Sequence, residues 1–256
     1  MTVARKVVVT AGLISFAAAV LAWQLTTSLS DWSPHVFPGP IQVMTSFWEL
    51  LASGELIKHS VASLFRVTLG FYLSALLGIP LGIFLGRIRV AKMLINPMIQ
   101  FLRPISPLAW IPLAMLWFGI GDPPAIFLIF LSSFFPLVVS TTIAVNRINP
   151  IYFQVAANFD LSRYEVITKV VISAIVPSVV TGLRLTVTIA WLVVVAAEMI
   201  AVQSGLGYLI LDARNALRMD YVMNGMIVIG LIGLTLDGIM RRMGRIESAS
   251  WGLVTG

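Results

Sequence analysis

Four ionisable residues lie close together in one segment of an otherwise apolar chain. They are Asp160, Arg163, Glu165 and Lys169, within QVAANFDLSRYEVITKVVISAIVP, residues 154–177. Ser162 precedes Glu165 by three residues, the spacing of a capping box that starts a helix. Charged groups at a bend between two helices, with aromatic rings beside them, can anchor a partner protein.

The shape of this segment follows from the same residues. We expect a helix over about 152–159, a break near Asp160 and Leu161, and a second helix from Ser162. Three aromatic residues, Tyr152, Phe159 and Tyr164, give it an amphipathic contact surface. An ordinary solvated loop is the alternative interpretation, and it explains the capping signal and the aromatic residues less well.

Other ionisable residues fall inside apolar runs. Arg103 precedes several prolines in LRPISPLAWIPLAMLWFGIG, where a broken helix would line a cavity and Arg103 would contact an anion. Alternatively, its side chain extends to the membrane surface. Arg184 and Glu198 face the bundle interior or lie near opposite boundaries of one span; about 21 Å of helix separates them, so they cannot pair.

Several kinds of chemistry are excluded by what the sequence lacks. There is no G-x-S-x-G or H-E-x-x-H motif, so no hydrolase site is indicated. With no Cys and two His far apart in sequence, no metal site is supported. No G-x-x-x-x-G-K-[ST] loop is present, so any ATP must bind to another chain.

Composition indicates an all-α integral membrane protein. Hydrophobic residues make up 59% of the chain, charged residues 11%, and the mean hydropathy is +0.97. The apolar runs have the length of membrane-spanning helices rather than of barrel strands. The net charge of +6 is explained by Lys and Arg retained on the cytoplasmic side, so nucleic acid is not an expected partner.

Six spans are predicted, at about 7–25, 64–85, 94–118, 125–145, 170–202 and 221–240. The third contains several prolines and must be kinked or broken. With both termini cytoplasmic, most Lys and Arg residues lie inside, and so does the loop 147–169. We treat 1–256 as a single domain, with a first span and a periplasmic amphipathic segment in 1–63 and a core in 64–240.

Small residues recur every fourth position in the second predicted span, at Gly70, Ser74, Gly78, Gly82 and Gly86. Such a stripe lets another helix backbone approach closely. It indicates either packing within one subunit or a helix that slides or tilts during transport.

The segment at 154–177 resembles the cytoplasmic loop motif of permease subunits in ATP-binding-cassette importers, whose usual form is E-A-A, then Gly, then I-x-L-P. The matching residues are Gln154, Val155 and Ala156, then Asp160, then Val171, Ile172 and Ser173. Gln154, Asp160 and Ser173 depart from the pattern. The stretches LRPISPLAWIPLAMLWFGIG and AAEMIAVQSGLGYLILDARN resemble the nitrate, sulfonate, taurine and bicarbonate permease group.

The resemblance implies the fold of a type I importer in the cell's inner membrane. It implies a second permease copy, two ATPase subunits that hold ATP and Mg, an extracytoplasmic solute-binding protein, and no cofactor on this chain. The loop would form a coupling helix on the ATPase, with the contact residues Gln154, Val155, Ala156, Asn158, Phe159, Asp160, Leu161, Ser162 and Arg163. The path for a small anion would be lined by Arg103, Ser106, Trp110, Arg184 and Thr188.

Two other classes of function stay open at this point. A secondary carrier driven by an ion gradient needs ionisable residues near the membrane midplane, which the spans supply sparsely. It predicts that Glu198→Gln abolishes coupled uptake. A membrane scaffold without transport needs no cavity, and the proline-broken third span argues against it.

Overall fold

The computed structural model describes residues 2–29, 33 and 36–250, and every regular element in that part of the chain is helical. The helices are α1 (Thr2–Leu29), α2 (Pro40–Ala52), α3 (Glu55–Arg87), α4 (Arg89–Leu102), η1 (Pro107–Trp110), α5 (Ile111–Phe118), α6 (Asp122–Asn146), α7 (Pro150–Asn158), α8 (Arg163–Glu165), η2 (Val166–Ile172), α9 (Ser173–Ala201), α10 (Leu206–Asn215) and α11 (Met219–Ser250). The predicted all-α class is confirmed.

Within the described residues, five helices are long and apolar enough to cross a membrane: 10–29, 55–87, 122–146, 163–201 and 219–242. Helix α4 and the helices η1 and α5 form a bent pair with an angle of 88°, and counting this pair as one span gives six. The predicted break in the third span is therefore confirmed. Pro104 and Pro107 lie at the bend, where missing N–H donors and ring clashes prevent a continuous helix.

The amphipathic segment within 1–63 is divided between two helices, because α2 ends at Ala52 and α3 begins at Glu55. Gly54 separates the two helices with φ +77°, a conformation that glycine adopts without steric cost. The second span consequently begins at Glu55 rather than at about residue 64.

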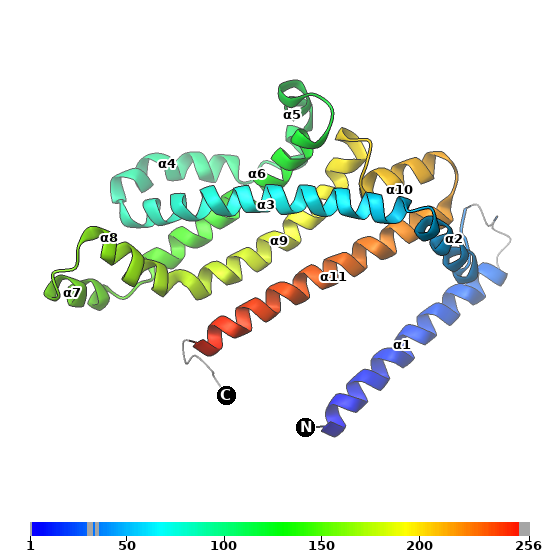
Figure 1. Ribbon diagram of the computed structural model, residues 1–256, viewed down its shortest axis with the longest axis horizontal. Helices are drawn as coiled ribbons and strands as arrows, with labels where there is room; N and C mark the ends of the chain where they lie inside the picture. Colours follow the sequence, from blue (N-terminus) through cyan, green and yellow to red (C-terminus); the bar gives the residue numbers. More distant parts are fainter. Residues whose placement is uncertain (1, 30–32, 34–35, 251–256) are drawn as a thin grey trace.

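Helices α3, α6 and α9 pack together lengthwise, and α11 lies against α9 (Figure 1). Helices α7 and α8 lie at one end of this bundle, and α2 and α10 lie at the other. The start of α1 and the end of α11 both point away from α2 and α10. In this view α1 stands apart from the bundle, and the indole N–H of Trp23 donates to the carbonyl of Pro38 over 3.2 Å.

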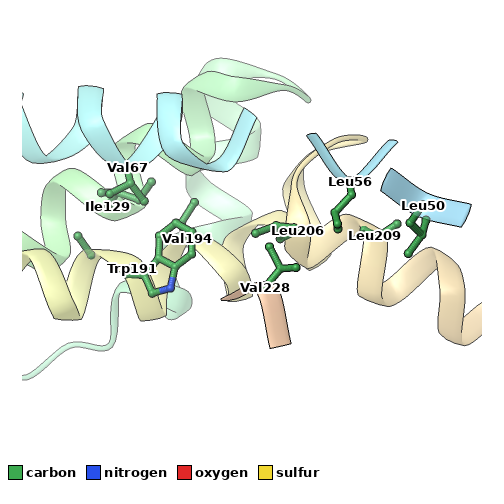
Figure 2. Packing of buried hydrophobic residues seen from close by; sticks show 10 residues of the cluster. Leu50, Leu56, Val67, Ile129, Trp191, Val194, Leu206, Leu209 and Val228 are labelled. Atoms are coloured by element: carbon green, nitrogen blue, oxygen red, sulfur yellow. The ribbon is translucent and has the colours of Figure 1, made fainter. Parts of the chain in front are cut away.

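A hydrophobic cluster joins the bundle to α2 and α10 (Figure 2). It comprises Leu50, Leu56, Val67, Ile129, Ala190, Trp191, Val194, Leu206, Leu209 and Val228. Trp191 buries its ring here, and its indole N–H donates to the carbonyl oxygen of Ile229 over 3.0 Å. This bond satisfies the one polar atom of a large side chain that is otherwise in apolar surroundings.

The small-residue stripe of α3 faces α6. A Cβ added at Gly82 would lie 2.6 Å from the Cβ of Thr141, and one at Gly86 would lie 2.5 Å from the Cβ of Val145. The hydroxyl of Thr142 donates to the carbonyl of Gly82 over 3.1 Å. The stripe therefore packs two helices of one subunit, the first of the two interpretations.

Replacing Gly82 with Ala is expected to lower the free energy of unfolding by about 1–3 kcal/mol, because the added methyl group overpacks this seam. Thermal unfolding of the purified chain in detergent measures the change. Gly230→Ala is the matched control, since nothing lies within 4 Å of a Cβ at that helical position. Equal melting temperatures for the two variants would contradict the close packing.

Candidate functional site

The bent segment, residues 150–169, begins with a well-capped helix. Asn149 is the N-cap of α7, and its side-chain oxygen accepts a hydrogen bond from the N–H of Ile151 over 3.0 Å. Pro150 follows at the first helical position, where its missing N–H costs nothing. Local sequence alone thus fixes where α7 starts.

The break after α7 lies where it was predicted. Asp160 has φ +49°, and its N–H donates to the carbonyl of Ala157 over 3.1 Å. The N–H of Leu161 reaches back to the carbonyl of Ala156 over 3.0 Å. Together these bonds form a Schellman motif, in which a left-handed residue ends the helix. Asp160 therefore adopts the left-handed conformation at the position where the resembled motif has Gly.

The capping box at the start of α8 is also present. Glu165 accepts from the N–H of Ser162 over 3.0 Å, and the hydroxyl of Ser162 accepts from the N–H of Glu165 over 3.3 Å. Lys169 pairs with the same carboxylate at 2.8 Å. The chain then continues through η2, a π-helical stretch with i→i+5 hydrogen bonding, into α9. The capping box that the sequence predicts at Ser162 and Glu165 is therefore confirmed.

The predicted contact residues of the bent segment mostly face outward. Exposed side chains are Gln154, Val155, Asn158, Phe159, Asp160, Ser162 and Arg163, whereas Ala156 is buried and Leu161 is half-buried. Phe159 and Tyr164 are 76% and 75% exposed. Large aromatic side chains with that exposure, on a segment held by caps, form a surface suited to a partner protein.

The segment is fastened to the bundle on its other face. Phe153 and Val166 pack against the buried cluster of Ala144, Val145, Val171 and Ile175. The guanidinium of Arg87, at the end of α3, lies 4.4 Å from the centroid of the Phe153 ring. This cation–π contact links α3 to α7, so a movement of the bent segment reaches two long helices.

The predicted path residues do not form one cluster within the chain. Trp110 packs against a cluster that includes Ala197 and Ala201, about 20 Å along α9 from Arg184. Among the described residues, the guanidinium of Arg103 is exposed and has no acidic partner. Thr188 is exposed one turn after Arg184 and donates to its carbonyl over 3.3 Å.

Arg184 is not a free cation. Its Nε lies 2.9 Å from the carboxylate of Asp237 on α11, which Arg241 also contacts. The pair joins α9 to α11 and holds the guanidinium of Arg184 against a carboxylate that it shares with Arg241. The sequence does not indicate this partner, because Asp237 lies 53 residues further along the chain.

A second polar site was also missed. Arg66 on α3 and Glu198 on α9 are 2% and 0% exposed and pair at 2.6 Å. Asp122, at the start of α6, approaches the same guanidinium at 2.7 Å, and the carbonyl of Ser204 accepts from it over 2.8 Å. We call these residues, with Ser63, Gly205 and Gly207, the Arg66–Glu198 cluster.

The rest of this cluster organises the start of α10. The carboxylate of Glu198 accepts hydrogen bonds from the hydroxyl of Ser63 over 2.8 Å and from the N–H of Gly207 over 3.0 Å. The N–H of Gly205 donates to Nδ1 of His59 over 3.0 Å. A carboxylate near a helix N-terminus is favoured by the helix dipole. The pairing of Arg66 with Glu198 could have been expected from the rule that ionisable residues within membrane spans usually pair with one another.

The chain is similar to known membrane components of transport systems. The family model of the binding-protein-dependent transport system inner membrane component matches residues 78–246. The chain is 36% identical over 234 residues to the aliphatic sulfonates transport permease protein SsuC of Bacillus subtilis, covering 91% of this chain and 85% of that one. It is 35% identical over 236 residues to the nitrate import permease protein NrtB of Leptolyngbya laminosa, covering 89% and 83%.

The fold has a counterpart among solved structures. A chain of the MetNI methionine ABC transporter, in inward facing conformations, matches with a TM-score of 0.67 and 15% identity, covering 77% of this chain and 97% of that chain. The expected type I importer fold is thereby confirmed. From the family model, the two permease relatives and the shared fold, we conclude that the chain is a multi-pass inner-membrane permease component of a binding-protein-dependent ABC transport system, in the sulfonate and nitrate group.

Proposed function

We propose that this chain, with a second copy, forms the membrane path of an ATP-driven importer for a small anionic solute. The solute would be of the sulfonate, taurine, nitrate or bicarbonate type, delivered by a solute-binding protein on the outside. Two separate ATPase subunits would hold ATP and Mg and perform the hydrolysis. Family membership and the sulfonate and nitrate relatives support this assignment.

The observation that carries the proposal is the bent segment. It is rigid because both of its helices are capped, and it exposes Phe159 and Tyr164. Its inner face is fastened to α3 and α9 through Phe153, Arg87 and Val166. When the ATPase subunits close, the segment would move with them and pull on the spanning helices.

The path itself is proposed along the axis between the two copies, with Arg103, Ser106, Trp110 and Thr188 facing it. Arg103 supplies an exposed positive charge at the bend in the third span. Arg184 contributes less to anion binding, since Asp237 holds its guanidinium. Both termini and the bent segment would be cytoplasmic, in keeping with the excess of Lys and Arg on that side.

The test removes the exposed aromatic rings of the bent segment. The variant Phe159→Ala with Tyr164→Ala should weaken ATPase binding by roughly thirtyfold or more, since one interface anchor is commonly worth about 2 kcal/mol. Co-purification with the ATPase measures binding, and uptake of radiolabelled taurine or nitrate into vesicles loaded with ATP measures transport.

Tyr72→Ala is the control, because Tyr72 is 66% exposed on α3, far along the chain from the bent segment. It should leave both ATPase binding and uptake unchanged. The proposal fails if the double variant retains the ATPase, or if uptake by the unaltered chain continues without ATP and follows an ion gradient.

A further inference from the structure

A groove of about 690 Å³ lies between the end of α3 and the bent segment. Its lining is Pro80, Ile83, Phe84, Arg87, Ile88, Leu161, Arg163, Val166, Ile167 and Ile172. All of these residues are apolar except the two arginines. The volume falls within the range of sites that bind small molecules, about 300–1,000 Å³.

The two arginines come from opposite walls of the groove, Arg87 from α3 and Arg163 from the bent segment. Arg87 is the last residue of α3, and Ile83 and Phe84 precede it by about one turn, deeper in the span. On the opposite wall, Arg163 is the first residue of the helical run 163–201, and Ile167 and Ile172 follow it along that run toward α9. Each wall therefore passes from an arginine at the end of a long helical run to apolar side chains further along the same run.

The charge at the arginine end suits an anion. In the described part of the chain, no carboxylate pairs with either Arg87 or Arg163. The nearby carboxylate of Glu165 is already held by Lys169 and by Ser162. An anion placed between the arginines would thus meet two positive charges that no acidic side chain neutralises.

We propose that this groove binds one anionic phospholipid. The phosphate would lie between Arg87 and Arg163, and an acyl chain would lie against Ile83, Phe84 and Ile167 at the membrane surface and continue along α3 into the membrane. A phospholipid has the same order of groups, with a charged phosphate at the membrane surface and hydrocarbon below it. The bound lipid would connect the end of α3 to the bent segment, and the proposal holds whether or not an ATPase docks there.

Native mass spectrometry of the full chain in detergent, titrated with dioleoyl phosphatidylglycerol, tests the proposal. Each cation near a lipid surface contributes about 1 kcal/mol, or about fivefold in binding. The variant Arg87→Gln with Arg163→Gln should therefore bind this lipid roughly thirtyfold more weakly, while Arg87→Lys with Arg163→Lys should retain most of the binding. Arg147→Gln is the control, an exposed arginine at the end of α6 that does not line the groove.

Further binding measurements distinguish a phospholipid from other occupants of the groove. Phosphatidylcholine should bind more weakly than phosphatidylglycerol, and soluble glycerol phosphate should not displace the bound lipid. Ile167→Ser should weaken lipid binding, because it removes apolar surface from the wall. The proposal is overturned if glycerol phosphate competes as well as the lipid, if the Gln and Arg147 variants bind equally, or if Ile167→Cys crosslinks to a second copy with lipid present.

Discussion

Replacing Glu198 with Ala is expected to lower the free energy of unfolding by about 3–5 kcal/mol, the usual cost of removing one partner from a buried ion pair. Glu198 is fully buried and accepts hydrogen bonds from Arg66, Ser63 and the N–H of Gly207. Ala would leave these donors without that acceptor, and the one carboxylate left to Arg66 would be that of Asp122, whose side chain is half-exposed.

Thermal unfolding of the purified chain in detergent, followed by tryptophan fluorescence, measures this loss. Glu49→Ala is the matched control, because Glu49 is 60% exposed and lies 3.4 Å from Arg218. An exposed pair of that kind contributes about 1 kcal/mol or less. Similar losses in the free energy of unfolding for the two variants would show that the buried pair of Arg66 and Glu198 stabilises the fold no more than an exposed pair does.

The same residue separates the importer from a gradient-driven carrier. Glu198→Gln keeps one acceptor oxygen and should lose less stability than Glu198→Ala. For a carrier that uses this carboxylate to move protons, Glu198→Gln would abolish uptake while the fold remained intact. The ion pair with Arg66 instead assigns Glu198 a structural role, so we expect any loss of uptake to follow the loss of folded protein.

Gly207→Ala is the second large effect that we expect. A Cβ at this position would lie 2.1 Å from the carbonyl oxygen of Val195 and 2.9 Å from the Cβ of Glu198. Because the nearer atom belongs to the backbone of α9, the helix itself would have to move. Overpacking costs about 1–3 kcal/mol and occasionally more, and we place this variant at or above the upper limit.

A comparison with Gly205→Ala sharpens the prediction. At Gly205 the added Cβ would meet the side chain of Glu198, with 2.2 Å to its Cδ, and φ is +104°. Removing that side chain should relieve part of the clash, so Gly205→Ala should cost less in the Glu198→Ala background. Gly207→Ala should cost the same in both backgrounds, since its clash is with a carbonyl. Unfolding of the unaltered chain and of five variants, the three single and the two double ones, completes the two double-mutant cycles that decide this.

Features encoded by neighbouring residues could be predicted from the sequence. The capping box depends on Ser162 and Glu165, which are only three residues apart in sequence. The break at Asp160 lies directly before this box and is located by it. The break in the third span is marked by its prolines. Long apolar runs located the spanning helices, because mean hydropathy is calculated over a window of neighbouring residues and does not require knowledge of the fold.

Features that depend on distant pairs were not predictable in the same way. Arg66 and Glu198 lie 132 residues apart, and Arg184 and Asp237 lie 53 apart. Only the packing of α3 and α11 against α9 brings them together. The break at Gly54 was missed for another reason: one glycine within an amphipathic pattern does not show that the backbone turns left-handed there.

The number of residues in the π-helical stretch η2, Val166–Ile172, affects the direction in which the docking surface of the bent segment faces. It carries the chain from the bent segment into α9, and because a π-helix has wider turns, each of its residues advances the rotation by somewhat less than the about 100° of an α-helix. Adding or removing a single residue there would turn the exposed rings of Phe159 and Tyr164 toward another direction while leaving both caps intact. The number of residues in this joint therefore sets the direction in which the exposed rings face, separately from the packing of its side chains.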